Sequence, residues 1–239
     1  MPVVTPVWTR VRHHRDHWAV TQTLCLPPRV PAPAVDPYNI PAFSLGNRLR
    51  RAVWGLSYEV FFRFTPRPLH RWRIWVLQLF GARIGRGCAI YPTARIWAPW
   101  NLVCEDTVAI AEDVVIYNPA PVTLKSHAIV SQQAYLCGAT HDQDDPAFPL
   151  IAKPIVIERY AWICARAVAQ PGITVREGAV LGLASVATRD LDPWTVYVGA
   201  PARAVKKRKS FCLQCVKRMK KACWCMVLSA PMVSSAVVA

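Results

Sequence analysis

A six-residue repeat of aliphatic or small residues runs through the middle of the chain, and the residue four places after each repeat position is usually small. No helix repeats every six residues, and an isolated strand alternates every two. A short strand followed by a tight corner does take six, and three such sides form one turn of a triangular solenoid. The pattern therefore predicts a mainly β fold, a parallel β-helix of about five turns. Its fifteen repeat positions are Ile84, Ile90, Ile96, Cys104, Ile110, Ile116, Leu124, Val130, Leu136, Ile157, Ile163, Ala169, Val175, Leu181 and Ala187.

A different pattern precedes the repeats, in residues 36–83. Apolar residues lie largely along one side of two predicted helices, 49–64 and 69–80, which a proline-containing turn at 66–68 separates. Arginines are interspersed, so both helices are cationic and amphipathic. One interpretation is a helical cap that covers the open edge of the first solenoid turn. The other, compatible with the first, is contact with a membrane surface that carries a lipid-linked substrate.

The two ends of the chain lack both patterns. Residues 1–35 are proline-rich and predict a flexible leader, and residues 209–239 form a basic tail that we expect to be disordered. Two cysteine pairs in the tail could bind zinc, but the second pair is tighter than usual and the spacer is short, so no metal is expected. The four cysteines of the tail are Cys212, Cys215, Cys223 and Cys225.

The charge of the chain is concentrated at its ends. Of 29 basic and 14 acidic residues, the segment 36–205 holds 17 and 13, a net charge of only +4 against +15 for the whole. No nucleic-acid-binding motif accompanies the charge, so we expect no nucleic-acid partner. A hydrophobic content of 53% argues against a disordered protein. The first thirty residues have no secretory pattern, and no apolar run is long enough to cross a bilayer, which favours a cytoplasmic protein.

One long interruption divides the repeats, between Leu136 and Ile157, and we assign it to an extruded loop at 137–156 within a β-helix domain at 84–208. A long excursion costs conformational entropy and adds nothing to the rungs, so chemistry is expected there. Thr140 occupies the fourth place after the repeat position Leu136. This placement predicts that the chain leaves the solenoid only after Thr140. His141 would then be the first residue outside, and a histidine held there can act as a general base.

Several short segments accompany the repeats: 96–102, 117–118, 140–142, 193–196 and 199–203. Together with the repeats they resemble the hexapeptide-repeat acetyltransferases over about 36–208, and the segment 96–102 is similar to the branch of colanic acid biosynthesis acetyltransferases. The resemblance implies a left-handed parallel β-helix, an exception to the usual right-handed crossover. It also implies a homotrimer, with acetyl-coenzyme A bound in the groove between neighbouring subunits.

The resemblance further implies an O-acetyltransferase in which His141 deprotonates a hydroxyl of a sugar or an exopolysaccharide intermediate, for direct attack on the thioester. Asn118 and Asp142 would contact the acceptor. The positions matching the cofactor site are Trp162, Ala165, Leu183, Thr188, Arg189 and Arg203.

Structural alternatives stay open for these residues. Asn118 could only hold a turn, Trp162 could only pack on the surface, and Asp142 could orient His141 or lie free in the loop. The arginines could be solvated rather than bound to phosphate.

Three positions depart from the family pattern, which usually has glycine directly after a repeat position. Here Glu158, Gln170 and Arg176 stand instead. Charged corner residues can point outward, so the fold should survive, although cofactor affinity could change. The alternative function is a non-catalytic trimeric β-helix scaffold or binding protein. A zinc-dependent carbonic anhydrase of this fold would need a third histidine, which the repeats lack.

Overall fold

A computed structural model describes residues 42–145 and 147–210. The predicted leader at 1–35, most of the tail and its four cysteines therefore lie outside the described residues.

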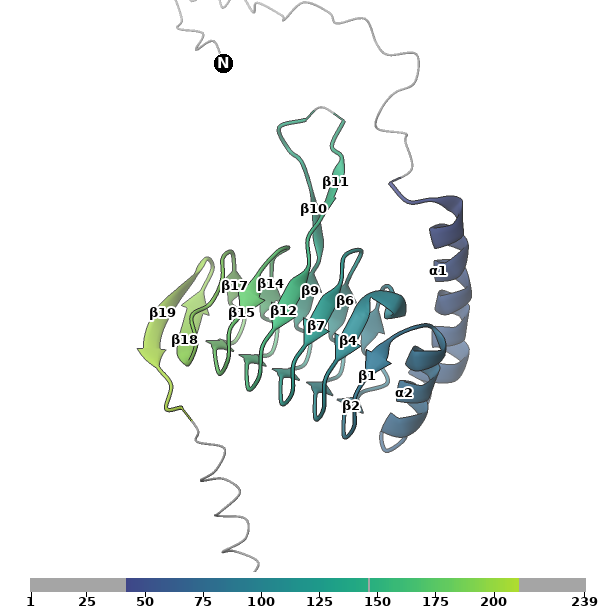
Figure 1. The fold of residues 1–239 in the computed structure, drawn as a ribbon, viewed down its shortest axis with the longest axis horizontal. Helices are drawn as coiled ribbons and strands as arrows, with labels where there is room; N and C mark the ends of the chain where they lie inside the picture. The colour runs from purple at the N-terminus through teal and green to yellow at the C-terminus, as the bar shows by residue number, and fades with distance from the viewer. Residues whose placement is uncertain (1–41, 146, 211–239) are drawn as a thin grey trace, which may run out of the picture. The chain divides into compact units, whose positions relative to one another are not determined.

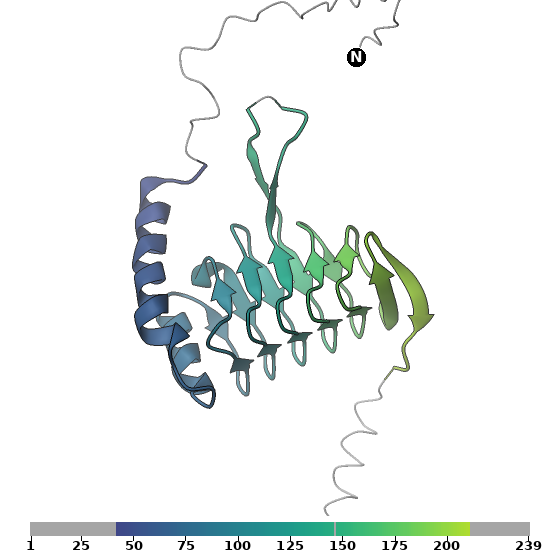
Figure 2. The ribbon, with the colours of Figure 1, turned by 180° about the vertical axis from the view of Figure 1, so that it is seen from behind.

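Three parallel sheets form the sides of the solenoid (Figures 1 and 2). Strands of one sheet are separated along the chain by a complete turn, as expected of a β-helix. Side A contains β1 (Arg83–Ile84), β4 (Leu102–Cys104), β7 (Val122–Leu124), β12 (Ile155–Ile157) and β15 (Thr174–Val175). Side B contains β2 (Ala89–Ile90), β5 (Ala109–Ile110), β8 (Ile129–Val130), β13 (Trp162–Ile163), β16 (Val180–Leu181), β18 (Thr195–Gly199) and the antiparallel β19 (Ala202–Lys207). Side C contains β3 (Arg95–Ile96), β6 (Val115–Tyr117), β9 (Tyr135–Cys137), β14 (Val168–Ala169) and β17 (Val186–Ala187).

The repeat positions line the interior of this solenoid. All fifteen are buried, with Ile84 the most exposed at 9%. Residues before and after them point outward, because side chains alternate across a strand. Five complete turns are followed by the beginning of a sixth, where Leu191 bridges to Val175 and β18 continues side B. The predicted β-helix is confirmed, with about six turns.

Left-handed backbone conformation recurs at a fixed place in the corners between sides A and B. The third residue after each side-A repeat position has φ between 57° and 69°. These five residues are Gly87, Thr107, His127, Tyr160 and Gly178. Such a conformation costs an L-residue about 1–2 kcal/mol unless it is glycine or asparagine. The stacked turns therefore hold three non-glycine residues in this region.

A hairpin formed by β10 (Ala139–His141) and β11 (Leu150–Ala152) projects from the corner between sides C and A (Figure 1). At its base Gly138 N donates to Tyr117 O at 2.6 Å, and a Cβ on Gly138 would lie 2.5 Å from that oxygen. Thr140 pairs with Ile151 and is exposed. The prediction that Thr140 still fills the solenoid is therefore wrong: the close approach at Gly138 already turns the chain outward.

Two helical segments cover the first turn. Helix α1 (Leu45–Tyr58) continues into a π-helical turn, η2 (Glu59–Arg63), and α2 (His70–Leu79) follows. Ser44 caps α1 through its hydroxyl, which accepts from Asn47 N at 3.3 Å. The buried residues Trp54, Phe62, Val76 and Leu77 belong to the same apolar core as the first rungs. A further short 3₁₀ helix, η3 (Pro99–Asn101), forms the first corner between sides C and A.

Most of the apolar side of the two helices faces outward, away from that core. The exposed residues are Leu45, Leu49, Val53, Leu56, Val60, Phe61, Phe64, Leu69, Trp72, Trp75 and Leu79. In the described part of the chain, no helix is long and apolar enough to cross a membrane.

Candidate active site

His141 lies on the projecting hairpin with its imidazole exposed, and Nδ1 is 2.6 Å from the carbonyl oxygen of Phe148. A carbonyl oxygen can only accept a hydrogen bond, so Nδ1 carries the hydrogen of the neutral ring. The lone pair is then on Nε2, where a proton can be taken up. Pairing of His141 with Leu150 across the hairpin holds the backbone of this residue in register. The arrangement suits a general base.

Asp142 does not orient this imidazole. Its Oδ1 accepts a hydrogen bond from Asp144 N at 3.1 Å, and its own backbone N donates to Pro149 O at 3.0 Å. The carboxylate thus closes the turn at the hairpin tip, as aspartate commonly does two residues ahead of a backbone N–H. An acceptor contact by Asp142 stays a prediction.

Asn118 is fully buried at the corner between sides C and A, one turn before the hairpin. Its Oδ1 accepts from Ala98 N at 2.9 Å, and its Nδ2 donates to Ala98 O at 2.8 Å. Asn101 Nδ2 in turn donates to the carbonyl oxygen of Asn118 at 3.1 Å. Both groups of the side-chain amide are therefore hydrogen-bonded within the corner. This geometry agrees with the alternative in which Asn118 holds a turn. An acceptor contact by Asn118 stays a prediction.

The six predicted cofactor residues are not brought to one place in a single chain. Trp162 is on the outer face of side B, and Ala165 and Leu183 occupy the corner between sides B and C on successive turns, where Ala184 N donates to Ala165 O at 3.0 Å. Thr188 and Arg189 follow β17, in the corner between sides C and A, and are exposed. Arg203 is exposed in β19, opposite Val198 of β18. The first three therefore share one edge of side B, whereas His141 and the pair after β17 belong to another edge.

An apolar column runs along the outer face of side B and was missed by the sequence reasoning. Trp162 is 42% exposed and its indole Nε1 donates to Ser131 Oγ at 2.8 Å, while its neighbour Ile129 is 45% exposed. The signal for it was present, because the residue before each side-B repeat position is apolar. In register order the column is Ala89, Ala109, Ile129, Trp162, Val180 and Val196.

A pocket of about 490 Å³ between α1 and the outer face of side C was also missed. Trp97 and Tyr117 meet edge to face in its wall, with ring centroids 5.4 Å apart, and the Arg51 guanidinium lies 4.4 Å over Trp97. Burial raises the pKa of Tyr58 in the same wall, although Arg95 nearby lowers it in part. Tyr117 pairs in register with Cys137, directly before the hairpin. The pocket thus adjoins the base of the element that carries His141. The repeats alone could not predict this pocket, since α1 supplies four of its eleven lining residues.

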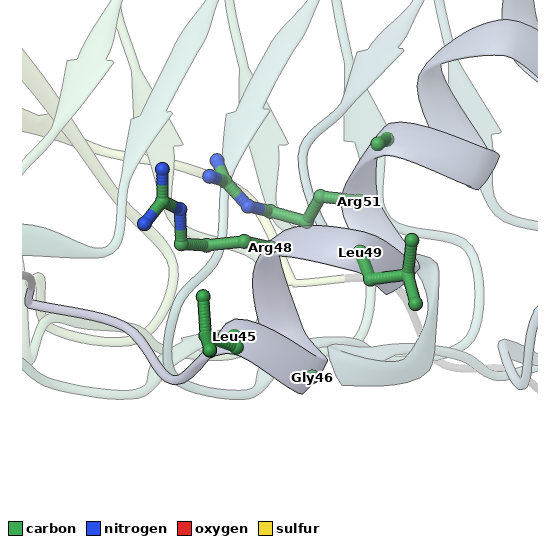
Figure 3. Close-up of a pocket in the computed structure, with 6 residues that line it drawn as sticks. Leu45, Gly46, Arg48, Leu49 and Arg51 are labelled. Atoms are coloured by element: carbon green, nitrogen blue, oxygen red, sulfur yellow. The ribbon is translucent and has the colours of Figure 1, made fainter.

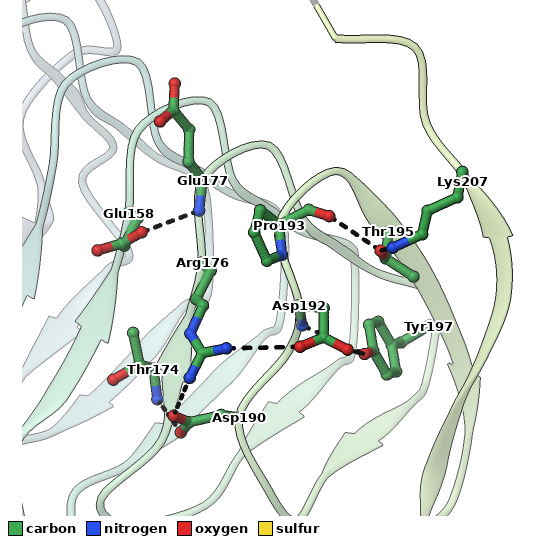
Figure 4. A network of polar contacts seen from close by, with 10 residues as sticks. All are labelled: Glu158, Thr174, Arg176, Glu177, Asp190, Asp192, Pro193, Thr195, Tyr197 and Lys207. Carbon is green, nitrogen blue, oxygen red and sulfur yellow. Dashed lines mark hydrogen bonds and ion pairs between the residues drawn. The ribbon is translucent and has the colours of Figure 1, made fainter.

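Two of the three residues that depart from the family pattern are engaged in polar contacts along side A (Figure 4). Arg176 lies 3.3 Å from a carboxylate oxygen of Asp190 and 3.4 Å from one of Asp192. Glu158 pairs with Lys125 at 2.8 Å and accepts from Glu177 N at 3.0 Å. The hydrogen bond from Lys125 holds the pKa of Glu158 below its ordinary value. These side chains connect neighbouring turns at the corner after side A, so the fold accommodates them.

Among the described residues, no group of three or more histidine, cysteine, aspartate or glutamate side chains could hold a metal ion.

Known proteins resemble the chain in sequence and in fold. No family model matches it. WcaF of Escherichia coli (strain K12), whose name assigns it as an acetyltransferase to colanic acid biosynthesis, is 33% identical over 172 residues, 72% of this chain and 94% of that protein. The galactoside O-acetyltransferase of the same organism is 26% identical over 123 residues, 51% of this chain and 55% of its own.

Solved structures share the solenoid. The hexapeptide-repeat acetyltransferase VCA0836 from Vibrio cholerae complexed with acetyl-coenzyme A has a TM-score of 0.64 at 23% identity, covering 72% of this chain and 93% of that one. A galactoside acetyltransferase in complex with coenzyme A has a TM-score of 0.60 at 19% identity, covering 70% and 84%.

The fold is accordingly a left-handed parallel β-helix, as the resemblance implied. Because the chain is one third identical to WcaF over almost the whole of that protein, it belongs to the hexapeptide-repeat acetyltransferase family. It is therefore an acyltransferase, and the predicted cosubstrate, acetyl-coenzyme A, is bound in a solved structure of the same fold.

Proposed function

We propose that the chain transfers the acetyl group of acetyl-coenzyme A to a hydroxyl of a saccharide, with His141 as general base. The observation that carries the proposal is the hydrogen bond between His141 Nδ1 and the Phe148 carbonyl oxygen, at 2.6 Å, which leaves Nε2 able to accept a proton. The names of two relatives support a saccharide acceptor, since one belongs to colanic acid biosynthesis and the other is a galactoside O-acetyltransferase.

In the proposed reaction, Nε2 takes the proton of the hydroxyl as its oxygen attacks the thioester carbonyl. A new C–O bond forms and a tetrahedral oxyanion results. When the oxyanion collapses, the C–S bond breaks and the coenzyme A thiolate leaves. The imidazolium returns the proton to the thiolate, so the products are the acetyl ester and free coenzyme A, and no acyl-enzyme is formed.

The pocket between α1 and side C is a candidate for the acceptor. Its aromatic wall, which includes Trp97 and Tyr117, can pack against the apolar face of a sugar ring, while Arg51 and Arg95 can donate hydrogen bonds to oxygens. From Gly138, beside Tyr117, to His141 the chain advances three residues, about 10 Å along a strand. An acceptor longer than one sugar ring could therefore occupy the pocket and present a hydroxyl near His141. We therefore propose that the acceptor is an oligosaccharide or a saccharide intermediate on a carrier.

A homotrimer fits the separation of the predicted site. His141 projects from the corner between sides C and A, whereas Trp162, Ala165 and Leu183 lie along side B. A neighbouring copy that packs on side B would bring its hairpin to this edge, so that the groove is completed between subunits. Sedimentation equilibrium should give three times the mass of one chain, and a fully active monomer would contradict this part of the proposal. A cytoplasmic location likewise belongs to the proposal.

The test compares His141→Asn with the matched variant His127→Asn. His127 is the other histidine of the repeats; it stacks on Tyr160 at 4.8 Å and lies in a left-handed corner that asparagine tolerates. We expect His141→Asn to lower kcat by about 10²–10⁴-fold, with acetyl-coenzyme A affinity unchanged, and His127→Asn to leave both unchanged. Thiol release with a panel of oligosaccharides gives the rates, and calorimetric titration gives the affinity.

Undiminished turnover of His141→Asn would remove this residue from the mechanism. If the folded wild-type chain bound no acetyl-coenzyme A, the scaffold function would take the place of the enzyme.

A further inference from the structure

The helices that precede the solenoid expose a continuous apolar stripe. Leu45, Leu49, Val53, Leu56 and Val60 follow one another at intervals of three or four residues, which places them on one face of α1 and its continuation. Leu45 is 79% exposed and Leu56 is 70% exposed. Soluble monomeric proteins rarely leave a contiguous apolar patch of more than a few hundred Å² without a binding role.

Helix α2 extends this stripe. Trp72, Trp75 and Leu79 are exposed at intervals of three and four residues, and the two indoles lie 5.1 Å apart. Trp72 Nε1 donates to the carbonyl oxygen of Phe61 at 2.7 Å, which ties the outer face of α2 to the end of the preceding helical segment. Phe61 is itself 53% exposed. The two outer faces therefore form one surface, which we call the cap face.

Arginines accompany the cap face. Residues 42–87 contain nine arginines and one acidic residue, Glu59. Of the nine, Arg73 is buried, Arg63 pairs with Glu59 at 2.9 Å and Arg67 pairs with Glu112 at 2.6 Å, so the cationic excess beside the cap face comes from the others. Beside Leu45 and Leu49, the first turns of α1 border a hollow of about 790 Å³ into which the side chains of Arg48 and Arg51 extend (Figure 3). Among the described residues Arg48 forms no ion pair, so its charge is available.

We infer that the cap face docks on a membrane surface that contains anionic phospholipids. A face of leucine, phenylalanine and tryptophan bordered by arginine is what an interfacial helix needs: the apolar side chains enter the acyl boundary, and the cations meet the headgroups. Indole side chains favour that boundary, because they have an apolar body and a polar N–H. A protein partner with an apolar groove would not require the cationic excess. The inference does not depend on the reaction proposed above.

The test is cosedimentation of the full chain with vesicles of phosphatidylcholine alone and of phosphatidylcholine with one quarter phosphatidylglycerol. Leu56→Ser removes the transfer free energy of one leucine side chain, so we expect it to weaken binding to the anionic vesicles by about tenfold or more. Arg48→Gln should weaken it by about fivefold on anionic vesicles and have no effect on neutral ones. Val205→Ser is the matched control, because Val205 is 65% exposed on β19, far along the chain from the cap face, and should bind like wild type.

Thermal unfolding of each variant is measured alongside, and Leu56→Ser should unfold like wild type because its side chain is already in solvent. Equal vesicle binding by Leu56→Ser and wild type would overturn the inference. It would also be overturned if wild type bound neither kind of vesicle. A lower oligomeric mass of Leu56→Ser would then identify the cap face as a contact between copies.

Discussion

Arg73 is a fully buried arginine in α2, and no carboxylate pairs with it among the described residues. Its charge is instead met by four oxygens. Nε donates to Ile90 O at 2.6 Å and Nη1 donates to Thr65 Oγ1 and Pro66 O, both at 2.8 Å. Nη2 donates to Arg67 O at 2.6 Å. One side chain therefore fastens the turn between the helices to the first strand of side B.

We expect Arg73→Met to destabilise this attachment by about 2–4 kcal/mol. Ile90 O would be left buried without its Nε donor, which costs about 1–3 kcal/mol, and three hydrogen bonds from a charged group to Thr65, Pro66 and Arg67 would be lost, although water can reach this turn. The desolvation cost of the buried charge disappears with the guanidinium and offsets part of this loss. Urea unfolding followed by tryptophan fluorescence measures it, because Trp54 is buried where α1 meets the solenoid and donates to Ile96 O at 2.7 Å. The midpoint should fall by about 1–2 M, or a separate transition of the helices should appear.

Arg71→Met is the control for this measurement, since Arg71 belongs to the same helix but is exposed. A surface substitution of this kind should change stability by no more than about 0.5 kcal/mol. If Arg73→Met and Arg71→Met unfolded alike, the network of carbonyl oxygens would not be holding the helices.

Two further predictions concern the hairpin and the polar contacts of side A. Gly138→Ala would place a Cβ 2.5 Å from Tyr117 O, so the base of the hairpin must shift. Because His141 would then be displaced, turnover should fall by roughly 10–100-fold, while calorimetry should show unchanged acetyl-coenzyme A affinity. Normal turnover of this variant would refute the reasoning. The hydrogen bond from Lys125 lowers the pKa of Glu158 in the folded protein below its ordinary value of 4.5. The pair therefore stabilises the fold above pH 4.5, and this contribution is lost as the pH falls through the pKa of the folded state. Thermal melts from pH 3 to 7 should therefore converge for wild type and Glu158→Gln at acid pH, and a constant difference would contradict the linkage.

The solenoid could be predicted from the sequence because each rung repeats the same physical requirement. Inward-facing residues such as Ile110 and Leu136 have 0% exposure and must be apolar. The same requirement usually returns six residues later, so the sequence repeats the pattern many times. The backbone conformation of the corners was harder to predict from the sequence. The stacked turns hold even Tyr160 in a left-handed conformation, which a tyrosine residue disfavours.

The site was predicted only in part, because its geometry depends on contacts that have no period. His141 stood out through its place in the one long interruption. Its carbonyl partner, Phe148, lies just before β11 on the returning side of a hairpin that the repeats could not predict. Asn118 matched a family position, and only the structure shows its amide turned inward to Ala98. For the helices, amphipathic periodicity identified one apolar side, but it could not tell whether that side faces the core or the outside.

The three sides of the solenoid present different outer surfaces, and this difference bears on how copies would associate in the proposed trimer. At the corner after side A, carboxylates and cations of the same chain pair with one another, such as Arg176 with Asp190. The first strands of side C are covered by α1, whose Trp54 donates to the backbone of β3. On side B the outer column is apolar, and Ile129 and Trp162 remain 45% and 42% exposed in one chain. Burial of such a column is favourable at about 25 cal/mol per Å². Side B is therefore the face with most to gain from a neighbouring copy, and three of the six residues predicted to meet coenzyme A, Trp162, Ala165 and Leu183, lie on it or along its edge. The apolar column thus provides a physical reason for the proposed trimer contact and the predicted cofactor groove to share one edge.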